Sequence, residues 1–597
     1  MYWGSKKMKE LKNFIIYFVF VCINCNAVAQ TDKGIEYYSK KDFTNAIACF
    51  LQAAEQGDSA AQVRLANCYY NGEGVNKNYP EAVKWYKKAA EQGDVYAQYK
   101  FGRCYDFGEG VIKDQTEAVN WYKKAAEQGL ADAQYNLGVC YDNGEGVTTN
   151  HEEAVKWYRK AAGQGLADAQ YNLGVCYYNG EGVETDYEEA VRWYLKAAEQ
   201  GFADAQYSLG NSYYNGEGVE TDYEEAVRWY LKAAEQGFAD AQYSLGKCYM
   251  NGEGITENHE EAQRWYRKAA EQNNANGQIG LGLCYFLGFG VTEDRAEGIK
   301  WIRKAAEQGN AEAQLMMSNF YFQGNGVPKD NKEAFEWCMK SAEQGYADAQ
   351  LILGLCYKDG NGVPKDNTAA LKWIQTSANQ GNAEAQNQLF IMYYTGDGVE
   401  QDNTEALKWC KMAAELGHAK AQYNLGEIYS EGEITTQDYK EALKWYEKAA
   451  EQGNADAQFS IGFSYYNGTG VEKNSIEAVK WFRKAAEQGN VYAQFGLAIC
   501  YENGDGIDEN NYMAVKWYRK AALQGYSNAQ VNLGSCYEKG QGVARNYQEA
   551  VKWYRKAAAQ GNATAQRNLA NCYTYGRGVQ RNLAKANYWK EKACENE

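Results

Sequence analysis

The sequence predicts an all-α solenoid built from helix-loop-helix repeats. Fifteen of its sixteen tryptophans recur every 36 residues, from Trp85 to Trp589. Each 36-residue unit holds two stretches with apolar residues at helical spacing, separated by a glycine-rich loop. The three prolines, Pro80, Pro328 and Pro364, lie between that loop and the second stretch, where a missing N–H does little harm. A fixed period of this size is the signature of a solenoid.

In the repeat that spans residues 131–166, the first helix is predicted over residues 133–143. Ala133, Leu137 and Tyr141 are spaced i, i+4 and i+8 and form one apolar stripe, which we interpret as core. Gly138 lies within this helix, and Gly, Ala or Ser fills its position in fourteen of fifteen repeats, Phe390 being the exception. A small residue kept at this position predicts close packing of the two helices.

The loop and the second helix of the same repeat follow from capping signals. Gly144 is expected to end the first helix in a left-handed conformation, and the second helix is expected to begin near His151. In the next repeat Asp186 precedes Glu189 by three residues, which indicates an N-cap. The predicted buried stripe of the second helix is Ala154, Val155, Tyr158, Ala161 and Ala162, and its predicted solvated face is Lys156, Arg159 and Lys160. Ile434 replaces the second loop glycine of its repeat, so that turn is expected to differ.

Two such helices cannot bury both apolar faces alone, so we expect the repeats to stack into one continuous solenoid. Residues 58–597 form fifteen repeats in register. Residues 30–57 lack the glycine loop and read as a degenerate, tetratricopeptide-like N-terminal cap. The unbroken period overrides the prediction of several domains that length alone would make.

The motifs A-x-A-Q, L-G-x-x-Y, G-x-G-V, E-A-x-x-W-Y and K-A-A-E-Q-G resemble those of the Sel-one-like repeat family, a relative of tetratricopeptide repeats. The resemblance covers residues 58–597. It implies a right-handed superhelical α/α solenoid whose first helices line the concave face. It also implies an adaptor or scaffold for protein complexes rather than an enzyme.

Residues 1–29 differ in character from the repeats. Four lysines up to Lys12 precede the apolar run Phe14–Ile23, and Ala27-Val28-Ala29 has the A-x-A pattern of a cleavage site. We interpret this stretch as a secretory signal peptide that is cleaved before Gln30. The alternative is an uncleaved anchor, but an apolar run of about ten residues is short for a span of roughly 20. The mature chain is therefore expected to be exported, periplasmic or secreted, without a transmembrane segment.

Cysteine recurs at one position of the first helix. Export would permit disulfides, but equivalent positions of stacked repeats lie about 8–10 Å apart, beyond the roughly 7 Å that a disulfide spans. We expect buried free thiols. The cysteine-rich branch of the family carries a different pairing, which this chain lacks. The ten positions are Cys68, Cys104, Cys140, Cys176, Cys248, Cys284, Cys356, Cys500, Cys536 and Cys572.

Catalytic signals are weak. Ser244-x-x-Lys247 matches the S-x-x-K motif of penicillin-recognising enzymes, but neither K-T-G nor S-D-N accompanies it. Of three histidines, His151 and His259 share a helix-start position in different repeats, so no triad or metal cluster is predicted. We expect no catalytic, cofactor-binding or metal-binding residues. A net charge of −16 argues against nucleic acid.

Two positions of the first helix vary between repeats, those of Val139 and Asp142, and they share a face because they are three residues apart. In the middle repeats they become apolar or aromatic, which is typical of an interface. The alternatives are variation on an inert surface, or different packing of these repeats. The candidate partner-binding groove comprises Leu283, Phe286, Asn319, Phe322, Leu355, Lys358, Ile391 and Tyr394.

The sequence thus favours an exported, non-catalytic scaffold that binds a protein or peptide partner on the concave face. Two alternatives stay open. One is a penicillin-recognising or β-lactamase-like envelope protein. The other is a cell-wall glycan-binding module, for which the many tyrosines could stack against sugars.

Overall fold

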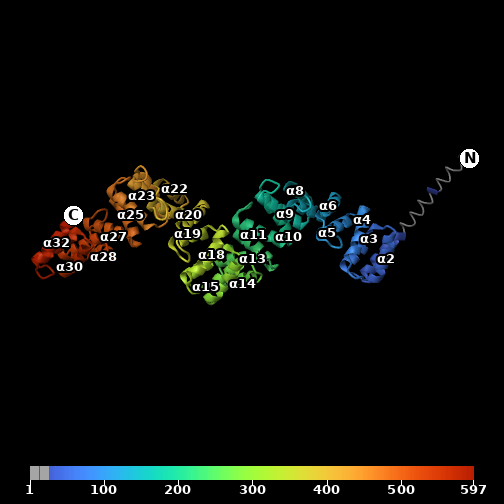
Figure 1. Ribbon diagram of the computed structural model, residues 1–597, viewed down its shortest axis with the longest axis horizontal. Helices are drawn as coiled ribbons and strands as arrows, with labels where there is room; N and C mark the ends of the chain where they lie inside the picture. The colour runs from blue at the N-terminus through green and yellow to red at the C-terminus, as the bar shows by residue number, and fades with distance from the viewer. Residues whose placement is uncertain (1–11, 14–25, 597) are drawn as a thin grey trace. The chain divides into compact units, whose positions relative to one another are not determined.

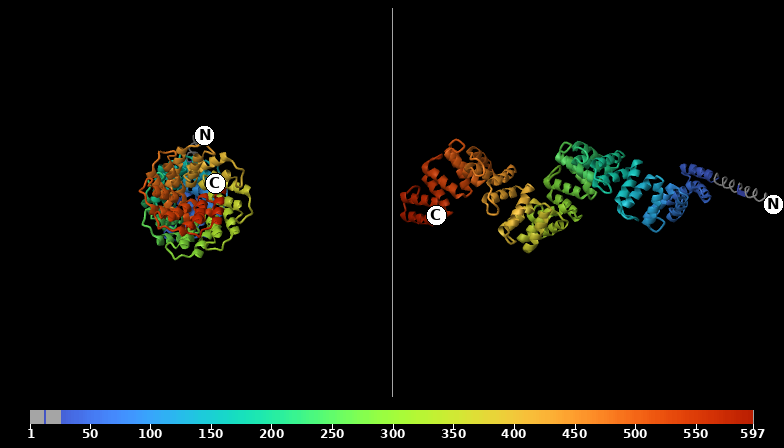
Figure 2. Two further views of the ribbon diagram at one scale, coloured as in Figure 1. Left: turned by 90° about the vertical axis from the view of Figure 1, so that its left-hand side faces the viewer. Right: turned by 90° about the horizontal axis from the view of Figure 1, so that it is seen from above.

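The computed structural model describes residues 12–13 and 26–596, and all regular structure in that part of the chain is α-helical (Figure 1). The apolar run Phe14–Ile23 of the predicted signal peptide lies outside the described residues. The chain divides into two compact units, Met1–Gln308 and Gly309–Glu597. Figure 2 shows the paired helices from two further directions. No described helix combines the length and the apolar character that crossing a bilayer requires.

In the first unit each repeat contributes a first and a second helix of 13 residues. The first helices are α3 (Ser59–Asn71), α5 (Val95–Phe107), α7 (Ala131–Asn143), α9 (Ala167–Asn179), α11 (Ala203–Asn215), α13 (Ala239–Asn251) and α15 (Ala275–Leu287). The second helices are α2 (Phe43–Glu55), α4 (Tyr79–Glu91), α6 (Gln115–Glu127), α8 (His151–Gly163), α10 (Tyr187–Glu199), α12 (Tyr223–Glu235), α14 (His259–Glu271) and α16 (Arg295–Glu307).

The second unit repeats the same alternation. Its first helices are α17 (Ala311–Gln323), α19 (Ala347–Asp359), α21 (Ala383–Thr395), α23 (Ala419–Glu431), α25 (Ala455–Asn467), α27 (Val491–Asn503), α29 (Ser527–Lys539) and α31 (Ala563–Tyr575). Its second helices are α18 (Asn331–Glu343), α20 (Asn367–Asn379), α22 (Asn403–Glu415), α24 (Tyr439–Glu451), α26 (Ser475–Glu487), α28 (Asn511–Leu523), α30 (Tyr547–Ala559) and α32 (Leu583–Glu595). The predicted all-α solenoid of 36-residue repeats is confirmed.

The predicted helix boundaries hold closely. Helix α7 begins two residues before the predicted start and ends before Gly144, whose φ is +76°, as expected of a left-handed C-cap. Helix α8 begins at His151, and the Asn150 side chain caps it by accepting from the Glu153 N–H at 3.0 Å. The N-cap predicted at Asp186 is confirmed by the same bond, from the Glu189 N–H at 2.9 Å.

The two helices of a repeat pack as the small residue at position 138 predicts. A Cβ added to Gly138 would lie 2.7 Å from the ring of Tyr158, so the ring packs directly on the backbone of α7. Ala133, Leu137 and the predicted stripe of α8 are buried, and its predicted lysines and arginine are exposed. Tyr141 differs from its prediction as core, because it is only half-buried. Its backbone carbonyl accepts from the Asn150 N–H at 2.8 Å and closes the loop.

A ladder of buried glutamines joins successive repeats. Gln134 donates from Nε2 to the Ala126 carbonyl at 3.0 Å and accepts at Oε1 from Gln164 at 2.8 Å. These bonds satisfy a buried amide that would otherwise destabilise the core by about 1–3 kcal/mol. The ladder is interrupted at Gln386, whose Oε1 has no partner because Leu416 replaces the donating glutamine. The sequence shows this glutamine in every A-x-A-Q motif, but only the structure shows what it bonds. The buried members are Gln62, Gln98, Gln134, Gln170, Gln206, Gln242, Gln278, Gln314, Gln350, Gln386, Gln422, Gln458, Gln494, Gln530 and Gln566.

The loops also join repeats. A Cβ on Gly146, whose φ is +71°, would lie 2.2 Å from the Gln115 carbonyl of the preceding repeat. Only Lys41 and Asn273 have positive φ among the described non-glycine residues. Ile434 therefore takes a different backbone conformation from Gly146, as its substitution for glycine predicts.

The start of the described chain continues the packing pattern. Residues 26–39 are helical, and a Cβ on Gly34 would lie 2.5 Å from the Phe50 ring of α2. Ala27 is buried and its carbonyl accepts from the Thr31 hydroxyl at 3.1 Å. The predicted cleavage before Gln30 therefore falls within this helix.

The cysteines of the first helices are buried and free within the described part of the chain. Burial raises the pKa of the Cys140 thiol to about 12, and Asp106 and Glu145 add to this shift. A thiol that stays protonated at neutral pH is a poor nucleophile and a poor metal ligand. These residues act as small apolar core side chains.

Candidate partner-binding site

The eight predicted groove residues divide between the two units, with Leu283 and Phe286 in the first and the other six in the second. None of the eight is fully exposed. Phe286 is buried. The backbone of Gly298 packs against it, since a Cβ added to Gly298 would lie 3.1 Å from the Phe286 Cβ. Tyr394 stacks on Phe390 with ring centroids 5.6 Å apart. Their role in partner binding stays a prediction.

At one of the two variable positions, that of Asp142, side chains connect neighbouring repeats, which the sequence did not reveal. A tyrosine there donates its hydroxyl to an acidic residue in the loop of the next repeat, as Tyr178 does to Glu217 at 2.8 Å. Lys358 forms an ion pair with Asp397 at 2.9 Å in the same way. Side chains at this position therefore hold neighbouring repeats together as well as facing outward.

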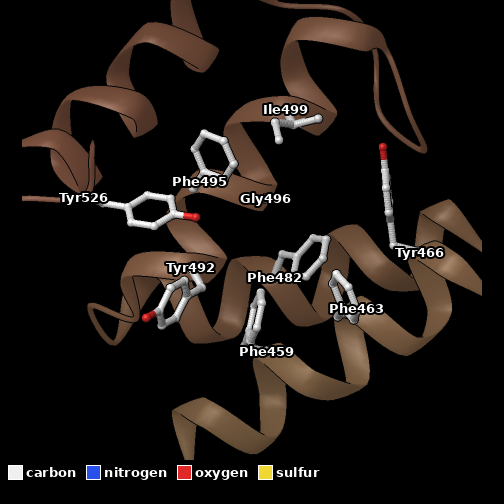
Figure 3. A pocket seen from close by; sticks show the side chains of 9 residues that line it. All are labelled: Phe459, Phe463, Tyr466, Phe482, Tyr492, Phe495, Gly496, Ile499 and Tyr526. Carbon is white, nitrogen blue, oxygen red and sulfur yellow. The ribbon is translucent and has the colours of Figure 1, made fainter. Parts of the chain in front are cut away.

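An apolar cavity lies in the second unit, between the first helices α25 and α27 (Figure 3). Its volume is about 220 Å³. Phe459 is its centre, with ring centroids 5.8 Å from Phe482, 5.7 Å from Tyr492 and 6.0 Å from Phe463. We call it the aromatic pocket; it is lined by Phe459, Phe463, Tyr466, Phe482, Tyr492, Phe495, Gly496, Ile499 and Tyr526.

The aromatic pocket exists because of substitutions at otherwise regular positions. Gly496 removes a side chain from its floor, and a Cβ there would lie 3.3 Å from the edge of Phe482. Gly280 occupies the same repeat position in α15, but its Cβ would lie 2.8 Å from Tyr266, so that site is filled. Tyr492 stands where most repeats carry an acid or amide. Phe463 and Ile499 occupy one of the two variable positions and Tyr466 the other, in later repeats than the predicted groove.

A second, polar hollow of about 370 Å³ adjoins the aromatic pocket and shares Phe459 and Phe463 with it. Glu427 and Glu431 of α23 line it. Glu427 accepts a hydrogen bond from the Tyr446 hydroxyl. Partial burial raises the pKa of Glu431, and the charges of Glu427 and Glu433 raise it further. We call this the acidic hollow; it places negative charge beside an apolar surface.

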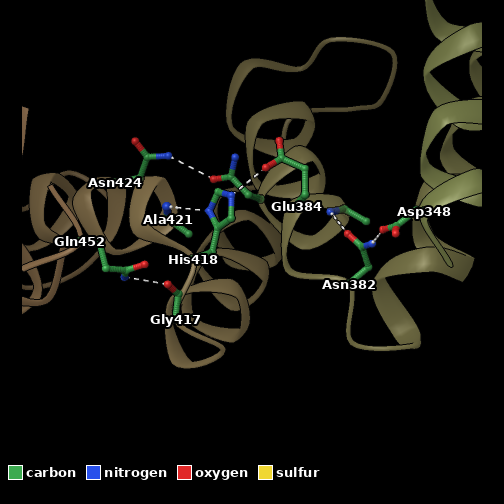
Figure 4. Close-up of polar contacts among 10 residues, drawn as sticks. Asp348, Asn382, Glu384, Gly417, His418, Ala421, Asn424 and Gln452 are labelled. Carbon is green, nitrogen blue, oxygen red and sulfur yellow. Dashed lines mark hydrogen bonds and ion pairs between the residues drawn. The ribbon is translucent and has the colours of Figure 1, made fainter. Parts of the chain in front are cut away.

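The histidines have structural partners. His418 accepts at Nδ1 from the Ala421 N–H at 3.1 Å, so its proton is on Nε2, which lies 2.7 Å from a Glu384 carboxylate oxygen (Figure 4). Asn382 and Asp348 make the corresponding contact one repeat earlier, at 2.7 Å. These contacts link the starts of successive first helices.

One group of possible metal ligands bears on the expectation of no metal-binding residues, which stays a prediction. Asp142, His151 and Glu181 each offer a ligand atom, and the three atoms lie within 4.8 Å of one another. The shared repeat position of His151 and His259 does not indicate this group, because Asp142 and Glu181 lie 39 residues apart in the sequence. Ser244-x-x-Lys247 shows no such convergence, because Lys247 lies over the Tyr214 ring at 4.9 Å.

Comparisons with known proteins identify the repeat. The Sel1 repeat model matches sixteen consecutive segments, of which the first is 28–58 and the last 563–597. A protective antigen of uropathogenic Escherichia coli with an SLR fold is 34% identical over 86% of this chain and 94% of its own, with a TM-score of 0.44. A Sel1 repeat protein from Oxalobacter formigenes is 34% identical over 53% of this chain and 95% of its own, also at 0.44. A comparison with curated proteins finds no match.

Proposed function

Because the chain belongs to the Sel1 repeat family, whose members are generally protein-interaction scaffolds, we propose that it binds a protein or peptide partner through the aromatic pocket. The first helices α25 and α27 form this surface. The mature protein acts without catalysis, as a scaffold that presents the site on a rigid repeat framework.

The exposure of the pocket's aromatic rim carries this proposal. Phe463 is 52% exposed and Tyr492 is 51% exposed, although the rings of both contact Phe459. Aromatic side chains clustered around a hollow are typical anchors of protein interfaces, because they bury a large area with little conformational entropy loss. A partner side chain that enters the pocket would cover both rings.

The acidic hollow indicates the chemistry of the partner. A lysine or arginine placed between Glu427 and Glu431 would relieve the repulsion that raises the pKa of Glu431. An apolar side chain in the aromatic pocket would lie next to that cation. We therefore expect a segment in which an aliphatic or aromatic residue stands beside a basic residue. The net charge of −16 would steer a basic partner toward this protein.

A glycan fits this surface less well. Sugars need hydrogen-bonding groups beside the stacking ring. The lining of the aromatic pocket offers three hydroxyls among four Phe, one Ile and one Gly, and one of the three, that of Tyr466, already donates to Asp505. Binding of purified cell-wall sacculi that depends on Tyr492 would favour the glycan-binding alternative.

Affinity capture with residues 30–597 as bait tests the site. The variant Phe463→Ser/Tyr492→Ser removes the exposed rim. Its matched control, Phe107→Ser/Tyr96→Ser, removes a pair of similar total exposure in the first unit, where Tyr96 holds the same repeat position as Tyr492. The proposal predicts a basic partner that the control captures and the pocket variant loses. Equal capture by both variants would contradict it.

Export is part of the same proposal and rests on the lysine-rich, apolar stretch before Gln30. N-terminal sequencing of the protein recovered from its native cells should begin at Gln30. An N-terminus at or near Met1 would contradict cleavage.

A further inference from the structure

Three positions meet at each joint between neighbouring repeats. They are a first-helix residue, the residue nine positions later that opens the second helix, and the loop residue 39 positions later in the next repeat. In at least six joints a hydrogen bond or an ion pair connects the first and the last of these residues. Tyr214 donates to Glu253 at 2.6 Å and Tyr466 to Asp505 at 3.0 Å, and Arg577 pairs with Glu538 at 3.2 Å with the charges reversed.

The joint between the repeats at 131–166 and 167–202 lacks this complementarity, as does the joint before it, which has Asp106 and Glu145. Asp142 and Glu181 are both carboxylates, and their oxygens lie within 4.8 Å of each other and of a ring nitrogen of His151. Two ionised carboxylates at this distance repel each other, and a cation bound between them would relieve that repulsion. His151 lies 2.7 Å from Asp142 through Nδ1.

The surroundings fix two of these groups. The Tyr158 hydroxyl donates to the second oxygen of Asp142 at 3.2 Å and so orients its carboxylate. His151 is the first residue of α8, where the helix geometry sets its backbone. Burial raises the pKa of the Cys176 thiol to about 12. The negative charges of Asp142 and Glu181 both raise this pKa further, so both act on the same thiol.

From this geometry we propose that Asp142, His151 and Glu181 bind a divalent transition-metal cation, zinc or a close neighbour, across the joint. An imidazole with two carboxylates suits these metals, whereas calcium and magnesium prefer all-oxygen sites. Ligands about 2.1 Å from a tetrahedral zinc lie roughly 3.4 Å apart. Because His151 Nδ1 lies 2.7 Å from Asp142, that contact would have to open slightly to admit the cation. Glu181 and His151 are exposed and can rotate to do so, and a water would complete the coordination.

The combination is specific to this joint. Among the described residues, only this group of three offers His, Cys, Asp or Glu ligand atoms within such reach. The preceding joint has Asp106 and Glu145 but Gln115 in place of the histidine, and the joint at His259 has Met250 and Phe289 in place of the carboxylates. The bound cation would connect two repeats at the positions where Tyr178 and Glu217 connect the next two repeats by a hydrogen bond.

Calorimetric titration of zinc chloride into the chelator-treated full chain tests the proposal. The wild type should bind one zinc ion. The variant His151→Gln should bind zinc at least about tenfold more weakly than the wild type. The control His259→Gln, which changes the equivalent histidine beside Phe289, should bind as the wild type does. Glu181→Gln, which changes the ligand supplied by the next repeat, should also lose binding. Circular dichroism melts of each variant verify folding.

Cobalt gives a second readout. Co²⁺ bound to the wild type should show the visible absorption of a low-symmetry site with a nitrogen ligand, and His151→Gln should abolish it. Absence of zinc binding by the wild type, or binding that survives both His151→Gln and Glu181→Gln, would overturn the proposal.

Discussion

The repeats at 131–202 and at 455–526 share one backbone pattern but present different surfaces on their first helices. In the earlier pair, Tyr135 lies 5.9 Å from Tyr158, and Asp142 faces the next repeat as part of a polar joint. In the later pair, Phe459 and Phe463 occupy the positions of Tyr135 and Val139, and a cavity opens beside them. The repeat framework therefore fixes where side chains stand, and a few substitutions decide whether they form a joint or a pocket.

Packing between the two helices of a repeat gives the largest expected effect. Gly138 faces Tyr158, whereas at the equivalent positions Phe390 shares its buried cluster with the small Cys410. Gly138→Phe alone should destabilise its repeat by roughly 3 kcal/mol through overpacking. Combining it with Tyr158→Cys should restore most of the loss. The melting temperatures of the two single variants and of the double variant measure this. If the two losses of stability add, the exchange of volume does not explain how Phe390 is accommodated.

A smaller effect distinguishes the two glycines at one repeat position. Gly280→Ala should lower the melting temperature, because the added Cβ would lie 2.8 Å from Tyr266. Gly496→Ala should leave it unchanged or raise it, since removing a helix-interior glycine is worth about 0.5–1 kcal/mol and the nearest atom is the pocket-facing edge of Phe482. If both substitutions change the melting temperature in the same direction, there is no more space beside Gly496 than beside Gly280.

The acidic hollow should give the smallest effect. Glu427→Gln/Glu431→Gln should weaken binding of a captured basic partner by about fivefold, since partly exposed charge pairs contribute roughly 1 kcal/mol or less. The affinity of this variant for the partner should also depend less on salt concentration than that of the wild type. Glu152→Gln/Glu188→Gln removes the same charge from exposed positions of the first unit and should change affinity little. Measurement is by fluorescence anisotropy of a labelled partner peptide, and equal losses in both variants would indicate a general effect of net charge.

Much of the fold is predictable because it depends on local signals repeated many times. Asn150, Gly144 and the alanines of α8 set caps, turns and core through spacing alone. The half-burial of Tyr141 was missed because apolar spacing does not show that a loop and solvent share its face.

The candidate sites depend on residues that are distant in sequence. Phe463 and Ile499 stand at a position that the sequence marked as variable, but the cavity also needs Gly496 and Phe482, whose fit is a matter of tenths of an ångström. The more apolar sequence around Phe286 led to the prediction of the groove in earlier repeats. In the structure the Phe286 side chain is buried. A concentration of aromatic residues on one face, from Phe459 to Tyr526, was the available signal. Asp142 and Glu181 are 39 residues apart, a separation with no local pattern.

Photo-crosslinking from within the aromatic pocket tests the central claim most directly. Benzoylphenylalanine placed at position 463, and in a control protein at position 107, would be irradiated with the exported fraction of the source cells. We predict a basic protein crosslinked at 463 and not at 107, with the attached peptide containing an apolar residue beside a lysine or arginine. A crosslink of equal yield at both positions, or none at 463 while the protein still captures its partner, would contradict the account.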